Sequence, residues 1–280
     1  MLPWRGGAQR AVTYARDDEN TFRQMTFLRP SHADALRQKG RRDEAAAHFR
    51  EEEIMRAKLL PEKPLLPALS GFHYCDLLLA ASERAAWRLM LNLAVSQPSS
   101  FAESSRAVSE RARQTLQWAE ECNASLATIA LDHLTLARAA LCETVLEGGA
   151  LGQLDSCRKS LERAVDGIRS ASHHDFLPFG LLTRAWLRRL TGPLTGPESA
   201  QTDLDEAFEI AERGPMRLHL ADIHLNRARL FGLTKDRLAN YPWKSPQDDL
   251  AKARDFIQKC GYWRRKEQLE DAEAAVRQPS

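Results

Sequence analysis

The sequence predicts an all-α protein built from stacked antiparallel helical hairpins. Nearly every segment between loops carries apolar residues at positions i, i+3, i+4 and i+7, the spacing that buries one face of a helix. Runs of Val, Ile and Thr alternating with polar residues, which are typical of strands, are absent. A third observation is an internal repeat of two kinds of helix, which predicts an array.

The composition is typical of a folded, water-soluble protein, and the sequence has 280 residues. An apolar content of 43% is enough for a continuous core, and 40 basic against 38 acidic side chains leave a formal net charge of +2. This balance predicts no strong general attraction to nucleic acid or to anionic membranes. The N-terminus lacks a signal-peptide pattern and the apolar runs are too short to span a bilayer, so we expect a soluble, cytoplasmic protein.

The five cysteines are odd in number and lack CxxC spacing, which argues against a disulfide framework and a zinc cluster. We expect them in small buried positions. Helix ends are marked by a capping box at Ser100 and Glu103, by an N-cap with proline at Ser245-Pro246, and by C-cap glycines at Gly214 and Gly261.

Two motifs recur with one period. The motif Leu-x-Arg-Ala-x-Leu occurs three times, with its arginine at 138, 184 and 227, at spacings of 46 and 43 residues. The motif Leu-x-x-Ala begins at Leu116, Leu161, Leu204 and Leu250, at spacings of 45, 43 and 46. Two interleaved series with a shared period indicate a repeated helical hairpin, whose alanines let helices cross closely in the core.

The expected organisation follows from these motifs. N-terminal helical repeats occupy 1–58, a proline-rich connector 59–69, the main array 70–260 and a C-terminal capping helix 261–280. Within them we expect hairpins at roughly 20–58, 70–122, 124–171, 176–213 and 215–260, then a helix over 262–276. Tyr241 and Trp243 are expected to anchor the long connection at 234–244.

The spacing Leu36-x3-Gly40-x4-Ala45-x3-Phe49 is matched by Gly152-x4-Cys157-x3-Leu161. These offsets resemble the second half of the tetratricopeptide repeat (TPR), although the period here exceeds the 34 residues of that family. The resemblance implies a right-handed α-solenoid, a TPR-like superhelix. Segments 71–79, 130–139, 211–231 and 261–275 look like the C-terminal repeat arrays of bacterial STAND- and TIR-type signalling proteins, in which such arrays follow an ATPase or effector domain.

The N-terminal segment Arg10 to Arg16 matches Arg163 to Arg169, so the chain is expected to enter in the second helix of a repeat and to belong to a longer array. No catalytic residue, metal site or cofactor is predicted. Neither GxxxxGK[ST] nor GxGxxG occurs, and Asp222 beside His219 offers only two potential metal ligands.

Recurring arginines are the main candidates for a binding surface. Arg138, Arg184 and Arg227 lie at one equivalent position of successive inner helices, and stacked together they would form a basic ladder for an acidic or carboxylate-ended peptide. The alternative is that each pairs with a carboxylate of an adjoining helix and orients its repeat. His133, Asp222 and His219 are expected near the same groove, which should therefore be mixed in charge.

The segment Tyr262 to Lys266 is aromatic and basic, a combination that RNA-binding proteins use. Acidic residues follow it at helical spacing, so we expect a solvated cap helix instead. The favoured function is non-catalytic recognition of a protein or peptide on the concave face, within a bacterial signalling or defence system. The alternatives are an RNA-binding helical-repeat protein and an enzyme with dispersed active-site residues.

Overall fold

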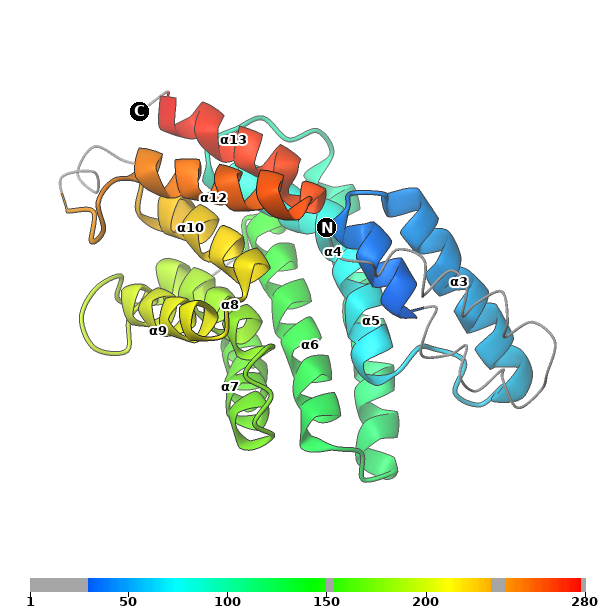
Figure 1. The fold of residues 1–280 in the computed structure, drawn as a ribbon. Helices are drawn as coiled ribbons and strands as arrows, with labels where there is room; N and C mark the ends of the chain where they lie inside the picture. Colours follow the sequence, from blue (N-terminus) through cyan, green and yellow to red (C-terminus); the bar gives the residue numbers. More distant parts are fainter. Residues whose placement is uncertain (1–29, 150–153, 233–239, 278–280) are drawn as a thin grey trace.

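A computed structural model describes residues 30–149, 154–232 and 240–277, which form helices joined by turns and loops, with no strand among them (Figure 1). The sequence match at Arg10 to Arg16 lies outside these residues. A helical segment at 30–38 precedes the labelled helices. Their bounds are α3 Arg42–Leu59, α4 Ala68–Met90, α5 Pro98–Glu121, α6 Leu126–Glu147, α7 Asp155–Ser170, α8 Leu177–Thr191, α9 Ala200–Arg213, α10 Arg217–Phe231, α12 Pro246–Cys260, the 3-10 helix η4 Trp263–Arg265 and α13 Lys266–Arg277.

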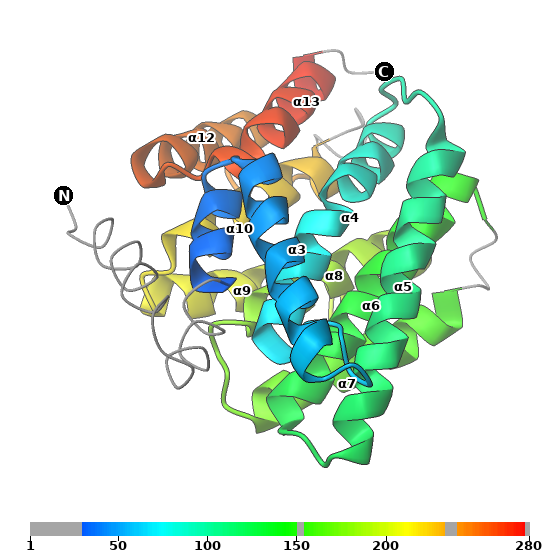
Figure 2. The same cartoon turned by 90° about the vertical axis from the view of Figure 1, so that its right-hand side faces the viewer.

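Helices pack against their neighbours in sequence order, so the all-α prediction is confirmed. Four of the five predicted hairpins correspond to α4 with α5, α6 with α7, α8 with α9, and α10 with α12. The one predicted at 20–58 lies partly outside the described residues, which there contain the 30–38 helix and α3. Additional contacts link α4 to α6 and α6 to α8, which places the first helices of successive hairpins side by side. Figure 2, turned by 90°, shows α3 in front of this inner set and α5 to the right of α4.

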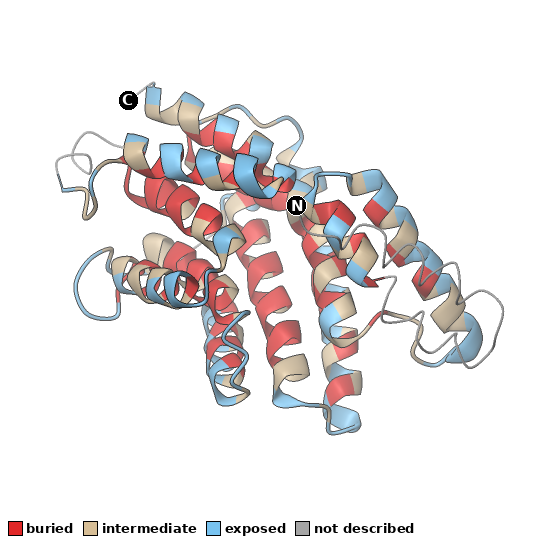
Figure 3. Ribbon diagram, viewed as in Figure 1, coloured by how far each residue is buried: buried red, intermediate tan, exposed pale blue. Residues whose placement is uncertain are grey.

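Burial follows this layering. Helix α6 is buried along most of its length because α4, α5 and α7 all pack on it, whereas α3 buries only Ala45, Phe49 and Glu52 (Figure 3). The recurring alanines are core residues, as predicted, since a methyl side chain lets two helix backbones approach. Those of both motifs have little or no exposed surface: Ala119, Ala139, Ala164, Ala185, Ala207, Ala228 and Ala253.

Three of the four predicted helix ends agree with the structure, among them Gly214, which directly follows the last residue of α9. Ser245 caps α12, accepting a hydrogen bond from the backbone N–H of Asp248 at 3.0 Å, and Gly261 ends that helix with φ +65°. The predicted capping box at Ser100 is wrong, because α5 already begins at Pro98 and Ser100 lies in its first turn. Proline, whose φ is fixed near the helical value, sets the earlier start.

The C-terminal elements return to the beginning of the array. In Figures 1 and 2, α13 lies beside α4, and ion pairs join Arg84 and Arg88 of α4 to Asp271 of α13. Tyr241 and Trp243 anchor the connection between α10 and α12, as predicted: Trp243 packs edge-on against Phe231 at 5.1 Å. Within the described residues, no helix has the length and apolar character needed to cross a membrane.

Candidate functional site

The three recurring arginines all form ion pairs with carboxylates of this chain. Arg138 on α6 contacts Glu83 of α4 at 2.6 Å, and Arg184 on α8 contacts Asp203 of α9 at 2.6 Å. Arg227 on α10 lies 3.1 Å from Asp205, which also belongs to α9. The interpretation in which each arginine pairs with an adjoining helix therefore describes the geometry of all three.

Their environments also differ, so equivalent positions in the repeat do not produce a continuous basic ladder. Arg138 is 7% exposed and points toward α4, whereas Arg184 and Arg227 meet α9 from two different helices. Arg227 stacks between Phe208 and Trp243, with its guanidinium carbon 4.5 and 4.4 Å from the two ring centroids. The indole N–H of Trp243 donates to Asp205, the same carboxylate that Arg227 contacts.

A buried ionic cluster occupies the middle of the inner layer. Asp76 and Glu83 lie two turns apart on α4 and face guanidinium groups on two sides. Arg138 contacts both carboxylates at 2.6 Å, and Arg37 from the 30–38 helix bonds Asp76. From the opposite side, Arg264 contacts Asp76 at 2.5 Å and Arg265 contacts Glu83 at 2.9 Å.

These guanidinium groups keep both carboxylates ionised. Burial by itself would raise the pKa of Asp76, but the charges of Arg37, Arg138 and Arg265 lower it far below its ordinary value. The pKa of Glu83 is lowered in the same way, by Arg138 and Arg265 against the effect of burial.

Asp222 on α10 extends the cluster toward the C-terminus. It is 1% exposed, lies 2.7 Å from Arg265 and accepts a 2.9 Å hydrogen bond from the hydroxyl group of Tyr262. The expectation of a solvated helix at Tyr262 to Lys266 is therefore wrong for three of its residues: Tyr262 is 2% exposed and Arg264 and Arg265 are each 8% exposed. The cause is the return of this segment to α4, whose carboxylates it neutralises. Arg264 and Arg265 are paired there and present no basic surface to RNA.

An aromatic and imidazole cluster adjoins the ionic one. Phe179 of α8 packs edge-on against Phe72 of α4 at 5.7 Å and against the His219 ring of α10 at 4.7 Å. Phe176 joins them at 6.0 Å from Phe72. Phe72 is buried, whereas Phe176, Phe179 and His219 are half-buried, so part of the cluster faces solvent. The periodicity alone did not single out these phenylalanines, because they lie near the start of α8 rather than in the recurring motif.

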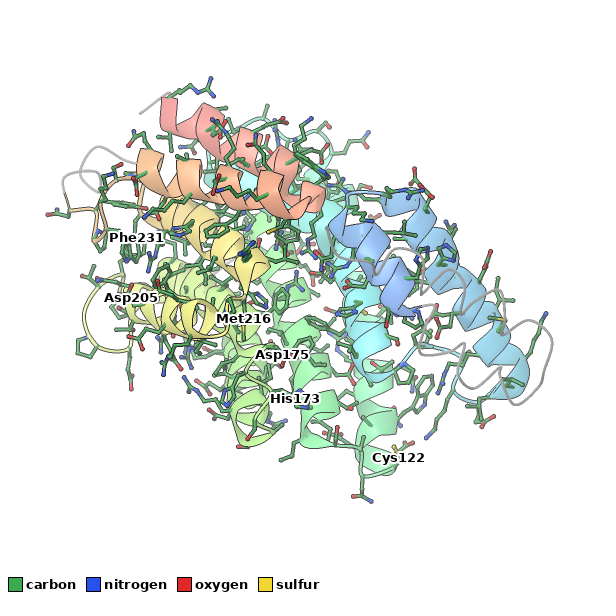
Figure 4. The ribbon with its side chains drawn as sticks, viewed as in Figure 1. Cys122, His173, Asp175, Asp205, Met216 and Phe231 are labelled. Carbon is green, nitrogen blue, oxygen red and sulfur yellow. The ribbon has the colours of Figure 1, made fainter. Side chains whose placement is uncertain are left out.

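His219 is held in place by the loop before α8. Its Nε2 lies 2.9 Å from the carbonyl oxygen of Asp175, on the same loop as His173 (Figure 4). Burial lowers the pKa of His219, and it also lowers that of His73 on α4, so both imidazoles are neutral near pH 7. A cavity of about 40 Å³ lies between the two clusters, and its wall includes Arg138, Phe179 and Arg265.

His133 does not belong to this region. It is 6% exposed, and the charges nearest its imidazole are those of Arg163 on α7 and Glu120 on α5. The structure brings Arg138, Asp222 and His219 together around the inner helices, and it places His133 and Arg184 elsewhere. The sequence places all of these residues near one groove, whereas in the structure His133 lies near charges of α5 and α7 and Arg184 pairs with Asp203 of α9.

The described residues include all five cysteines and the histidines considered as metal ligands. No group of three or more His, Cys, Asp or Glu side chains among them is arranged to hold a metal ion. Cys75, Cys142 and Cys157 are buried, and burial raises the pKa of each thiol, that of Cys157 to about 12, which disfavours the nucleophilic thiolate. The expectation of buried cysteines is wrong for Cys122 and Cys260, which are exposed.

In comparisons with known proteins, no protein-family model, no curated protein and no solved structure matches the chain significantly.

Proposed function

We propose that this chain is a non-catalytic protein-binding module, an α-solenoid of TPR-like hairpins that holds a peptide or partner domain on the face lined by α4, α6, α8 and α10. One observation carries the proposal. Phe176 and Phe179, at the start of α8, pack on Phe72 of α4, and His219 of α10 packs on Phe179. Phe176, Phe179 and His219 remain partly open to solvent.

Such a cluster has the properties of a binding hot spot. Aromatic rings supply large contact area at low cost in side-chain entropy, and a neutral imidazole adds a hydrogen-bonding edge. Neighbouring rings already hold these side chains in place, so little order has to be gained when a partner binds. The neighbouring ionic cluster is buried and paired internally, and it supports the proposal by joining α4 to α6 beside these rings.

The sequence resemblance described above supports a physiological setting. By analogy with the repeat arrays it resembles, the chain would act as a sensor or scaffold in a bacterial signalling or defence protein, in association with an ATPase or effector domain. The partner would then be a protein of the same signalling system.

Peptide display followed by alanine substitution tests the proposal. Peptides selected on the immobilised wild-type chain are expected to bind Phe179→Ala at least about tenfold more weakly, a loss of about 1.4 kcal/mol typical of a hot-spot aromatic residue. Ile54→Ala is the matched control, because Ile54 is 58% exposed on α3. Circular dichroism and a Phe179→Leu variant distinguish a lost contact from a lost fold. Equal affinity for all variants would place the binding surface elsewhere.

A further inference from the structure

The contact between the C-terminal segment and α4 is polar. We call residues 262–271 the clasp. Its outer ion pairs join Asp271 to Arg84 and Arg88, and Glu267 to Arg84 at 2.9 Å. Glu267 also meets Arg42 of α3, and the inner pairs are those of Arg264 and Arg265 with the two carboxylates of α4.

No hydrophobic cluster of the described residues contains both a clasp residue and a residue of α4. The buried apolar side chains of the C-terminal elements, among them Tyr262 and Leu269, pack with Leu225 and Ile257 of α10 and α12. Those of α4 belong to other clusters, with α6 and α8 or with α3. The apolar packing that holds α13 therefore attaches it to α10 and α12 and not to α4.

The outer pairs are open to water at their arginine ends. Arg84 is 28% exposed, Arg88 31% and Glu267 43%, whereas the side chain of Asp271 is 9% exposed. Salt therefore screens these pairs, most of all the one between Glu267 and Arg84. The guanidinium of Arg229 stacks on Trp87 of α4 at 4.9 Å, and the turn at Gly40 lies against the backbone of Trp263. Neither contact adds an apolar side chain of the clasp to the surface of α4.

Opening the clasp leaves a cation on both buried carboxylates of α4. Asp76 keeps Arg37 and Arg138, and Glu83 keeps Arg138. Within the clasp, Arg265 keeps its ion pair with Asp222 of α10, to which the clasp stays attached. The large penalty for leaving a buried charge unpaired is thus avoided for these three carboxylates. Arg264 and Asp271 lose their partners on α4, and both become exposed to water as the clasp opens. Asp76 and Glu83 each lose one guanidinium partner when the clasp opens. An arginine of another protein carries the same group and can replace it.

From these contacts we infer that the clasp is an intramolecular ligand, and that Asp76 and Glu83 accept an arginine-bearing segment of a protein partner in place of Arg264 and Arg265. The inference rests on the proposed function only in taking the partner to be a protein. The segment that fits is already present in the chain: an aromatic residue, one further residue, and two adjacent arginines, as in Tyr262 to Arg265.

A peptide of residues 259–275 tests the inference, carrying a fluorescent label and added to the full chain. In the chain variant Arg264→Ala/Arg265→Ala the intramolecular arginines are absent while Asp76 and Glu83 remain. This variant is expected to bind the peptide at least about tenfold more tightly than the wild type, in which the tethered segment competes at a high effective concentration. Fluorescence anisotropy measures the affinity.

Two controls assign the binding to these groups. Adding Asp76→Asn and Glu83→Gln to the chain variant is expected to abolish binding, and so is replacing both arginines of the peptide by alanine. Arg213→Gln, which removes an exposed pair with Glu209, should leave the affinity unchanged. If the folded Arg264→Ala/Arg265→Ala chain does not bind the peptide, the clasp is a permanent cap and the inference is overturned.

If the Arg264→Ala/Arg265→Ala variant does not fold, hydrogen exchange in the wild-type chain tests the inference instead. Amides of 266–277 are expected to exchange through a local opening that becomes at least about threefold more frequent as salt rises from about 0.05 to 0.5 M, while those of α6 stay unchanged. Exchange of 266–277 only through global unfolding would overturn the inference. The peptide-display experiment depends on Phe179 and not on the clasp, so either proposal can fail while the other holds.

Discussion

Trp87 of α4 and Trp186 of α8 stack with their ring centroids 4.5 Å apart and an angle of 22° between the ring planes. Both rings are buried, and the indole N–H of Trp186 donates to the sulfur of Met90 at 2.8 Å. The stack joins two inner helices that belong to different hairpins. It therefore holds together the layer on which both the aromatic and the ionic clusters are built.

Replacing Trp186 by alanine is expected to destabilise the protein by about 3–5 kcal/mol, because a large buried ring leaves a cavity that the surrounding helices fill only in part. Urea denaturation measures the change. Trp263→Ala is the control: this ring is 44% exposed, and its loss should cost less than about 1 kcal/mol. Equal effects of the two substitutions would contradict the role of the stack.

Stability should depend on pH through Asp132 of α6. Burial raises the pKa of its carboxyl group from 3.8 to about 7, although Thr115 donates a hydrogen bond to it at 2.8 Å. Below about pH 3 the group is protonated in both the folded and the unfolded state. As pH rises toward 7 the unfolded state ionises first, so the folded state loses stability, and the loss is complete above about pH 7.

Asp132→Asn removes this ionisation and retains an acceptor for Thr115. At pH 8 the variant is expected to be more stable than the wild type by up to roughly 4 kcal/mol, which corresponds to the rise of about three units in the pKa of Asp132 on folding. Urea denaturation at pH 5 and at pH 8 gives the comparison. A variant with the same pH dependence as the wild type would show that Asp132 is not the responsible group.

The small residues at the helix crossings give a third prediction. Ala185 of α8 has no exposed surface, so Ala185→Leu must push two helices apart and is expected to cost about 1–3 kcal/mol or more. The same change at Ala251, exposed on α12, should alter stability by less than about 0.5 kcal/mol. Thermal unfolding of both variants tests whether the repeated alanine marks a crossing.

Thiol labelling tests the burial of the cysteines. Brief treatment of the native protein with a maleimide is expected to modify Cys122 and Cys260, which are exposed. Cys75, Cys142 and Cys157 should react only in denaturant, because they are buried and a raised thiol pKa leaves little thiolate. Mass spectrometry of the intact protein counts the labels. Rapid labelling of Cys142 in the native state would contradict the packing of α6.

Helix positions and core residues were predictable from the sequence. The pattern of apolar residues located the hairpins to within a few residues, and the two motifs identified Ala185 and Ala207 as crossing points. Both features are local: the spacing of a helix repeats every few residues, and a close crossing needs a small side chain wherever it occurs. Ser245 and Gly261 were predictable for the same reason, because a cap depends on its own turn of helix.

The environment of each polar residue was decided by the tertiary structure. Arg138, Arg184 and Arg227 share one motif, yet they meet carboxylates in different directions, because each depends on which helix lies opposite. Arg264 and Arg265 are buried because α13 returns to α4, across 188 and 182 residues of sequence. A charge pattern within one helix carries no information about a partner so distant in the sequence. The sequence therefore determined the helical hairpins, and the return of the C-terminal segment to α4 determined the ionic cluster.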